Sequence, residues 1–253
     1  MEKSIGFIGA GRVTNILLQA FKNKNVSFKS IHVYDTNNEV SEKLKQKFLE
    51  INVSDLASVA RQEIIFIALH PPVIMETLAK IKEFVKAETV IISLAPKITS
   101  EKISDALANN NIVRLIPNAT SYINESYNPV CFSDNCKDKK EIFELLSLCG
   151  TTFETVESKL EAYAISSAML PTYFWFQWFE MIEIAKQIGL NEDESKKTIE
   201  ESLKAALNTA FKSGLSQSEI IDLIPVKPIG ENETQIKEIL NSKLIGLFNK
   251  IKP

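Results

Sequence analysis

Two glycines near the start of the chain, Gly9 and Gly11, lie where a short apolar run passes into a helical pattern. The apolar run covers residues 5–8, and the helical pattern begins at Arg12. One glycine permits a tight turn, and the other lets the backbone approach a bound group without a Cβ in the way. The start of a helix adds unpaired N–H groups that bind anions. The stretch therefore predicts a turn that binds a pyrophosphate through Gly9, Ala10, Gly11, Arg12 and Val13.

Asp35 is the next residue with a clear chemical use, because it ends the apolar run at 31–34. An acidic side chain at the end of the second strand accepts hydrogen bonds from the ribose of a bound dinucleotide. Its charge repels the 2′-phosphate of NADP(H), and residues 36–38 supply no arginine to hold that group. NAD(H) is therefore the expected cofactor, with NADP(H) possible. The alternative role for Asp35 is to cap the helix that begins near Asn38.

The elements that must position these residues follow from the hydrophobic pattern. Apolar runs alternate with helical patterns in the first half of the chain, at residues 5–9, 31–34, 64–69, 89–94 and 112–116. Strands that are apolar on both faces indicate a parallel sheet covered by helices on both sides. From about Leu160 only helical patterns remain, at 172–188, 192–213 and 233–250. The sequence predicts an α/β fold, with a doubly wound, mostly parallel sheet in residues 1–155 and an all-helical domain in residues 156–253.

Composition argues against several classes of function. The net charge is −3, from 29 Lys plus Arg against 32 Asp plus Glu, and the basic residues are scattered, so nucleic acid is not an expected partner. Cys131, Cys136 and Cys149 lack CxxC spacing, and the chain has two histidines, so no metal site is expected. Reduced thiols are typical of a cytoplasmic protein.

No membrane segment or export signal is expected either. Residues 166–185 approach the length of a membrane span but carry Pro171, Glu180 and Glu183. This segment is interpreted as a buried helix. The N-terminal apolar run is broken by its glycines and lacks a basic leader.

In the order of its motifs, nearly the whole chain resembles the pyrroline-5-carboxylate reductase family. Residues 5–11, IGFIGAG, match the first strand and glycine turn of that family, and Ala68-Leu69-His70-Pro71 stands where the family has an Ala-Val-Lys-Pro-like loop. Residues 113–120, VRLIPNAT, resemble its Arg-x-Met-Pro-Asn-Thr signature. A long helical stretch follows Pro171 and Tyr173, which match the family's Gly-Pro-Ala-Tyr turn.

The resemblance implies a Rossmann-type N-terminal domain and a helical C-terminal dimerisation domain that interlocks with its partner in a homodimer. It also implies hydride transfer from a nicotinamide to a small cyclic imine, either pyrroline-5-carboxylate to give proline or a related substrate. Pro117 and Asn118 should then border the nicotinamide, and His70 and Pro71 should flank the cofactor's ribose and phosphates. Such chemistry mainly requires alignment of the reacting carbons, so no catalytic side chain is assigned.

Two substrate-binding stretches depart from the family pattern. The family's Ser-Gly-Ser-Gly-Pro-Ala-Tyr turn reads SAMLPTY at 167–173, and its Thr-Ser-Pro-Gly-Gly-Thr-Thr loop reads VKPIGEN at 226–232. The threonine that family members use near the substrate nitrogen is absent from the aligned positions. Candidate substrate residues are Ser167, Tyr173 and Lys227. The substrate could be another imine or carbonyl compound, and the alternative function is a sensor or structural protein that binds the dinucleotide without catalysis.

Several side chains keep two possible roles. His70 could donate a proton or contact a phosphate, or it could be a rim residue without a catalytic role. Arg114 could contact the nicotinamide loop or a substrate carboxylate, or form an ion pair at the end of the sheet. Lys227 could pair with an acidic substrate group or remain in solvent. A cluster of aromatic residues is expected to be buried against its own domain and a second subunit: Tyr173, Phe174, Trp175, Phe176, Trp178 and Phe179.

Overall fold

The structure is a computed structural model that describes residues 2–253, and it divides into two compact units. The first unit runs to Met169 and adds Leu247–Pro253, and the second is Leu170–Gly246. The division therefore falls later than the domain boundary expected at residue 155, and the last residues of the chain return to the first unit.

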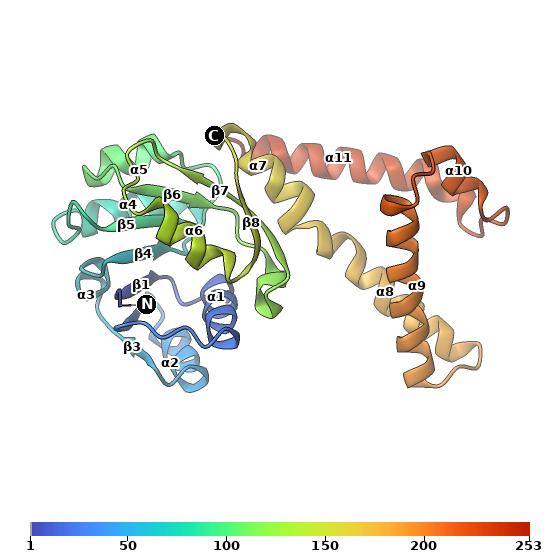
Figure 1. Ribbon diagram of the computed structural model, residues 1–253, viewed down its shortest axis with the longest axis horizontal. Helices are drawn as coiled ribbons and strands as arrows, with labels where there is room; N and C mark the ends of the chain where they lie inside the picture. Colours follow the sequence, from blue (N-terminus) through green and yellow to red (C-terminus); the bar gives the residue numbers. More distant parts are fainter. Residues whose placement is uncertain (1) are drawn as a thin grey trace. The chain divides into compact units, whose positions relative to one another are not determined.

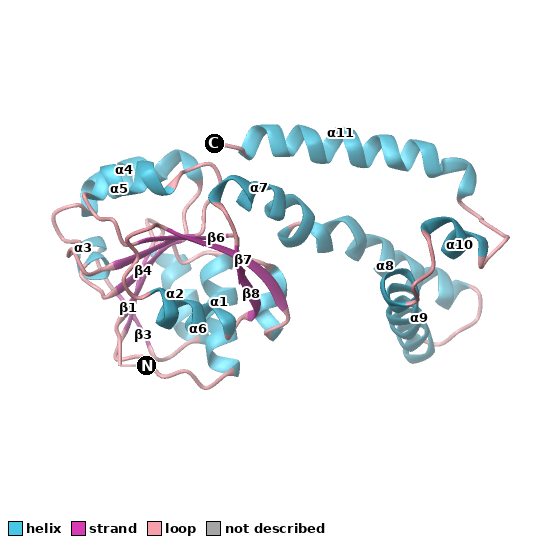
Figure 2. Cartoon of the chain, turned by 45° about the horizontal axis from the view of Figure 1, so that its top comes forward, coloured by secondary structure: helices cyan, strands magenta, loops and turns pink. Residues whose placement is uncertain are grey.

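The first unit contains an eight-stranded sheet in the order β3-β2-β1-β4-β5-β6-β7-β8. Only β6 and β7 pair antiparallel among the described strands, so the mostly parallel, doubly wound sheet is confirmed. The strands, drawn in magenta in Figure 2, are β1 Ile5–Ile8, β2 Ile31–Tyr34, β3 Ile51–Val53, β4 Ile64–Ile67, β5 Val90–Ser93, β6 Ile112–Leu115, β7 Ser126–Phe132 and β8 Gly150–Glu154.

Helices cover both faces of this sheet (Figure 1). Their bounds are α1 Arg12–Asn23, α2 Asn38–Lys47, α3 Leu56–Ala60, α4 Pro71–Ile81, α5 Ser100–Leu107 and α6 Lys139–Ser147. Phe7 of β1 packs with α1, α2 and α6, whereas its neighbour Ile8 packs with α3, α4 and α5. Successive side chains of a strand point to opposite faces, and both faces are buried here, which explains the continuous apolar runs.

Strands β3, β7 and β8 were not expected from the sequence. β3 has three residues, and β7 carries Asn128 and Pro129 within SYNPVCF. β8 lies at the edge of the sheet and reads GTTFE, with no fully buried residue. β3 and β8 lack the apolar pattern because few of their side chains face a core, whereas β7 is largely buried but includes the polar residues Ser126 and Asn128.

The segment that follows β8 belongs to the first unit. It comprises the short helix η2 Glu157–Lys159, α7 Leu160–Tyr163 and a π-helical turn, η3 Ala164–Ala168. Leu160 and Ala164 are buried against Ile116, and Ile251 near the end of the chain packs on the same small cluster. This packing explains why residues 156–169 group with the sheet.

The second unit consists of helices: α8 Leu170–Gln187, α9 Glu192–Lys212, α10 Gln217–Asp222, the short η4 Gly230–Asn232, and α11 Glu233–Ile251 up to Gly246. α9 begins at a capping box in which Asn191 and Glu194 exchange hydrogen bonds, and it packs on α8. Residues 170–246 include only two buried side chains, Ala185 and Ser195, in the described structure. No helix among the described residues has the length and hydrophobicity needed to cross a membrane.

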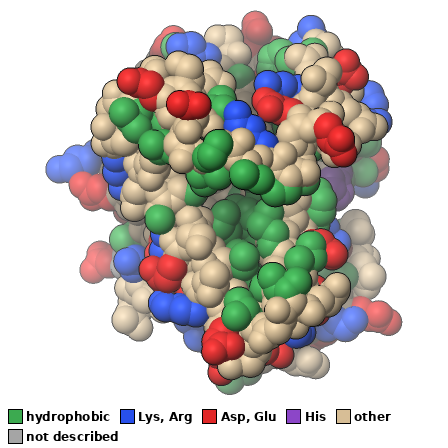
Figure 3. All heavy atoms as spheres, turned by 90° about the vertical axis from the view of Figure 1, so that its right-hand side faces the viewer, with side chains coloured by type: hydrophobic (Ala, Val, Ile, Leu, Met, Phe, Trp, Pro, Cys, Tyr) green, Lys and Arg blue, Asp and Glu red, His purple; other side chains and the backbone are tan. Residues whose placement is uncertain are grey.

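The aromatic cluster of α8 lies largely exposed in the single chain. Phe176 and Phe179 are both 67% exposed, and Phe174 stacks on Trp178. Figure 3 shows apolar side chains gathered at the surface of the face that it draws. The burial expected for this cluster is therefore not provided by the described chain alone.

Candidate functional site

The glycine turn joins β1 to α1 and has a geometry that only glycine satisfies at its first position. Gly9 has φ of +104°, and its N–H donates to the carbonyl of Tyr34 at 2.7 Å. A Cβ at this position would lie 2.4 Å from the carbonyl oxygen of Ala68. Any side chain would therefore strain the backbone and collide with the neighbouring turn.

Gly11 has a different role, because nothing lies within 4 Å of the position that its Cβ would occupy. It is the N-cap of α1 and provides no side chain to cap the helix. The open space therefore faces the start of a helix, where N–H groups and the helix dipole favour an anion. A groove beside the turn is lined by Arg12 and Asn15 on one side and by Lys43 and Lys47 of α2 on the other.

Thr14, in the third position of the glycine motif, is completely buried. Its hydroxyl donates to the carbonyl of Gly9 at 2.5 Å. A small residue is needed here so that α1 can pack closely on the sheet, and the hydroxyl finds a backbone acceptor within that contact. The threonine therefore fits the turn.

Asp35 is bonded to the glycine turn. One oxygen of its carboxylate accepts from the N–H of Ala10 at 2.8 Å, and the other accepts from the N–H of Asn37 at 2.9 Å. Helix α2 is capped by Asn37, whose side chain accepts from the N–H of Glu39 at 3.0 Å. The helix-capping alternative for Asp35 is therefore wrong. The carboxylate is fixed beside a pocket whose walls include Leu56 and Leu69.

The turns that follow β4 and β6 hold the other residues expected around the cofactor. His70 is exposed and is the N-cap of α4, without a side-chain hydrogen bond to that helix, and Pro71 is its first residue. Asn118 is buried, and its side-chain oxygen accepts from the N–H and the hydroxyl of Thr120 at 3.1 and 3.0 Å. Pro117 immediately precedes it. Both turns lie at the carboxyl ends of parallel strands, where doubly wound sheets bind ligands.

Asn118 also links an expected cofactor residue to an expected substrate residue. Its amide nitrogen donates to the hydroxyl of Ser167 at 3.3 Å. That hydroxyl in turn donates to the carbonyl of Tyr127 at 2.9 Å. Ser167 lies in the π-helical turn, a rare conformation that is frequent at functional sites. The structure thus brings the β6 turn and the segment before Pro171 together.

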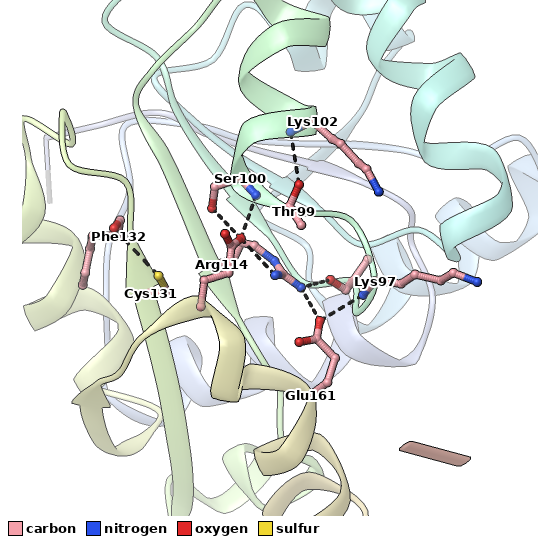
Figure 4. A network of polar contacts seen from close by, with 10 residues as sticks. Lys97, Thr99, Ser100, Lys102, Arg114, Cys131, Phe132 and Glu161 are labelled. Atoms are coloured by element: carbon pink, nitrogen blue, oxygen red, sulfur yellow. Dashed lines mark hydrogen bonds and ion pairs between the residues drawn. The ribbon is translucent and has the colours of Figure 1, made fainter. Parts of the chain in front are cut away.

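Arg114 forms a buried ion-pair network rather than facing open space (Figure 4). Its guanidinium, on a side chain 1% exposed, lies 2.6 Å from Glu161 and 3.0 Å from Glu157. The same Glu157 oxygen accepts from the N–H and hydroxyl of Ser100 at 2.7 and 2.9 Å. The ion-pair alternative for Arg114 is therefore the observed one.

The network sets the protonation of Glu157. Burial raises the pKa of this carboxyl, but the hydrogen bonds from Ser100 and Arg114 together outweigh burial, so its pKa lies below the ordinary value. Glu157 and Glu161 were not expected as site residues. The signal that could have found them is the charge of Arg114 within an apolar strand, which requires an acidic partner.

Tyr173 and Lys227 belong to the second unit. Tyr173, near the start of α8, is partly buried, and burial raises the pKa of its phenol. Lys227 is exposed beside an apolar groove whose walls include Ile220, Ile224 and Ile229. Among the described residues, no group of three or more His, Cys, Asp or Glu side chains has a geometry that could hold a metal ion.

Comparisons with known proteins bear on the whole chain. The family model "NADP oxidoreductase coenzyme F420-dependent" matches residues 4–97. The pyrroline-5-carboxylate reductase of Corynebacterium melassecola is 24% identical over 252 residues, covering 97% of this chain and 93% of its own length. That of Methanosarcina acetivorans is 23% identical, covering 88% of this chain and 84% of its own length. The resemblance found in the sequence is thereby confirmed.

Solved structures share the fold. Plasmodium falciparum pyrroline carboxylate reductase with NADP bound superposes with a TM-score of 0.83 at 22% identity, over 99% of this chain and 97% of that one. A pyrroline-5-carboxylate reductase from Coxiella burnetii gives a TM-score of 0.70 at 23% identity, over 99% and 95% of the two chains. The arrangement of sheet and helices described above is therefore that of known reductases.

Proposed function

We propose that this chain, a divergent relative of the pyrroline-5-carboxylate reductases over nearly its whole length, is an NAD(P)H-dependent oxidoreductase that reduces a small cyclic imine. The substrate is pyrroline-5-carboxylate, which gives proline, or a related compound. The observation that carries the proposal is the glycine turn, where Gly11 leaves open space in front of α1 and Asp35 is bonded to Ala10. This arrangement suits a dinucleotide.

The residues present can hold that cofactor and present its reactive end to a substrate. The turn from Gly9 to Val13 binds the pyrophosphate, and Asp35 binds the adenosine ribose. His70 and Pro71 flank the ribose and phosphates, and Pro117 with Asn118 borders the nicotinamide. A bound nicotinamide supplies the hydride. The protein's own contribution is to align the reacting carbons of the cofactor and the substrate. The hydrogen bond from Asn118 to Ser167 fixes the turn that borders the nicotinamide in this proposal.

NADH is the proposed preference. Both oxygens of Asp35 accept hydrogen bonds from backbone N–H groups, which hold the carboxylate in place at the end of β2. A 2′-phosphate at that position would face a fixed negative charge, whereas ribose hydroxyls would donate to it. The preference is one of degree, because Arg12 and Lys43 line the groove beside the turn and could attract a phosphate.

The second unit supports a homodimer. Its helices expose large apolar side chains, including Phe176, Phe179 and Phe211, and the unit buries almost no side chain of its own. Large contiguous apolar patches that a single chain exposes to water mark protein interfaces. The exposed apolar face of these helices therefore requires a partner surface. A second copy of the chain supplies that surface in the proposal.

A second function remains open, because the substrate-binding stretches differ from the family pattern. Met169 and Leu170 replace the second serine and second glycine of the family's Ser-Gly-Ser-Gly turn, and Val226 and Ile229 are strongly exposed in the other stretch. These changes favour a protein that binds the dinucleotide as a sensor or structural component and transfers no hydride. They also suit an enzyme with an altered imine substrate.

The test is oxidation of NADH by the purified protein with pyrroline-5-carboxylate, run beside NADPH and a control without substrate. Binding of NADH is measured separately by its fluorescence. Turnover on the order of 1–1,000 per second supports the reductase. Binding of NADH without turnover across a panel of cyclic imines and carbonyl compounds supports the second function, and failure to bind either dinucleotide contradicts both.

A further inference from the structure

The turn after β5 holds one residue in a conformation that side chains rarely adopt. Lys97 has φ of 74°, in the left-handed region that favours glycine. A residue other than glycine in this region is strained, and it persists where the surrounding structure imposes it. Such residues cluster at functional sites, so the strain at Lys97 calls for an explanation in terms of its surroundings.

The buried network around Arg114 imposes this conformation. Glu161 accepts from the backbone N–H of Lys97 at 3.0 Å with the same oxygen that accepts from Arg114. Glu157 accepts from the backbone N–H of Ser100 at 2.7 Å. The turn is thus bonded to the segment after β8 at two points. The Lys97 side chain itself is exposed, and Figure 4 shows it extending away from Glu161 and Arg114.

The place of this turn in the sheet brings Lys97 to the cofactor edge. Strands β4, β5 and β6 are parallel neighbours, so the turns that follow them lie along one edge. The turns after β4 and β6 hold His70 and Pro117, which the proposed function places around the cofactor. Lys97 therefore lies on the turn between them.

Lys97 is also the sole Lys or Arg in these three turns, residues 68–70, 94–99 and 116–118, and the turns contain no Asp or Glu. The charge of Arg114, on β6, is met by Glu157 and Glu161. No ion pair joins Lys97 to another side chain in the part of the chain that the structure describes. Lys97 is therefore the one positively charged side chain on these three turns.

We propose that Lys97 is a substrate-binding residue whose ammonium group pairs with the carboxylate of a small imine acid. This inference rests on the proposed function and specifies how its substrate is recognised. The buried network fixes the backbone of the turn, so that the lysine presents its charge beside the hydride donor at little further cost in entropy. A charge-assisted pair of this kind distinguishes an imine acid from the same ring without its carboxylate.

The experiment compares two substrates in the full-length protein: pyrroline-5-carboxylate and 1-pyrroline, the same ring without a carboxylate. The variants are Lys97→Gly, which removes the charge and relieves the left-handed strain, and Lys97→Arg, which keeps the charge. Lys102→Ala is the matched control, because Lys102 is an exposed lysine on the neighbouring helix α5. Thermal melting is measured for each protein. Binding of L-proline to the protein loaded with NAD⁺ provides a readout that does not require turnover.

For Lys97→Gly we expect kcat/KM for pyrroline-5-carboxylate to fall on the order of 10- to 100-fold. For 1-pyrroline we expect it to change less than about twofold, because that ring has no carboxylate to pair with Lys97. Weaker L-proline binding, an unchanged KM for NADH and a melting temperature equal to or above that of the wild type complete the expected pattern. Lys97→Arg should recover most of the loss, and Lys102→Ala should behave as wild type.

Other outcomes separate the two proposals. If the wild type reduces pyrroline-5-carboxylate and Lys97→Gly does so equally well, the assignment of Lys97 is wrong and the reductase proposal stands. A rise in KM for NADH with no change for the substrate contradicts the assignment too, since the lysine would then bind a cofactor phosphate. If the wild type reduces neither imine and does not bind L-proline, the assignment of Lys97 fails, and the panel of cyclic imines and carbonyl compounds decides the reductase proposal.

Discussion

The carboxylate of Asp35 accepts a hydrogen bond from the N–H of Ala10 at 2.8 Å, so the residue that ends β2 is bonded to the middle of the glycine turn. The glycine turn and Asp35 are therefore held together. The backbone of the turn, which binds the pyrophosphate in the proposal, depends for its shape on the side chain that binds the ribose. A change at Asp35 should accordingly affect both the choice of cofactor and the order of the turn.

Asp35→Asn tests the cofactor preference. The amide keeps one of the two acceptors that bind Ala10 and Asn37, loses the other, and removes the negative charge that opposes a 2′-phosphate. We expect KM for NADH to rise and KM for NADPH to fall, with their ratio moving toward NADPH about tenfold or more. Dissociation constants from the fluorescence of each bound dinucleotide check the same ratio without turnover. An unchanged ratio would mean that another part of the site selects the cofactor.

Gly9 and Gly11 provide a matched pair of substitutions. Gly9→Ala places a Cβ 2.4 Å from the carbonyl of Ala68 at φ of +104°, so we expect a loss of several kcal/mol in the free energy of unfolding, or no folded protein. Gly11→Ala adds a methyl group where no atom lies within 4 Å, and its backbone has φ of −76°. We expect this variant to melt as the wild type does and to bind NADH at least tenfold more weakly.

The result that would contradict this prediction is tight NADH binding by a folded Gly11→Ala variant. Such a result would show that the space in front of α1 does not receive the pyrophosphate. Urea unfolding followed by circular dichroism measures the stability of both variants, and fluorescence titration measures their affinity for NADH.

The network at Arg114 should make stability depend on pH in the acid range. The folded-state pKa of Glu157 lies below its ordinary value of 4.5, so the folded protein binds fewer protons here than the unfolded chain. The stabilisation is complete above pH 4.5 and is lost as the pH falls through the folded-state pKa. Glu157→Gln should therefore lower the free energy of unfolding at pH 7 and flatten its decline below pH 5. Urea unfolding at several pH values measures both effects.

Glu83→Gln is the control for this series. Glu83 is an exposed carboxylate in the segment between α4 and β5. The control should follow the wild-type curve. A Glu157→Gln curve parallel to that of the wild type would show that Glu157 does not contribute to the acid transition.

The exposed face of α8 should hold two copies of the chain together. The double variant Phe176→Ser with Phe179→Ser removes two rings that are each 67% exposed in the single chain. We expect light scattering to give about 57 kDa for the wild type, twice the 28.4 kDa of one chain, and a mass that falls toward one chain on dilution for the variant. Leu49→Ser is the control, since Leu49 is 77% exposed in the first unit. Equal masses for the double variant and wild type would place the interface elsewhere.

The sequence predicted the parts of the fold whose side chains are buried on both faces. The runs at β1, β4, β5 and β6 are buried on both faces because successive residues face different cores, whereas β2 is fully buried on one face alone. The glycine turn was predicted because backbone geometry requires glycine at Gly9. β7 and β8 escaped prediction, since polar residues and a proline interrupt the pattern. The second unit's long helices were predicted because their patterns are long and uninterrupted.

The network around Arg114 could not be read from local sequence, because its partners come from distant parts of the chain. Glu157 and Glu161 lie beyond two intervening strands, and only the antiparallel return of β7 and the edge strand β8 bring them to the end of β6. The conformation of Lys97 depends on the same contacts. Local patterns predict elements, whereas the positions of these charges depend on how elements far apart in sequence meet.

The return of the last residues to the first unit has a consequence for synthesis of the protein. Ile251 packs on the cluster of Ile116, Leu160 and Ala164, so the helical unit is an insertion between two parts of one folded body. A nascent chain emerging from the ribosome can complete its sheet once β8 has been made, but it cannot close this cluster until residue 251 has left the exit tunnel. The first unit is thus begun first and finished last, and the helices of the second unit are synthesised before the first unit is complete.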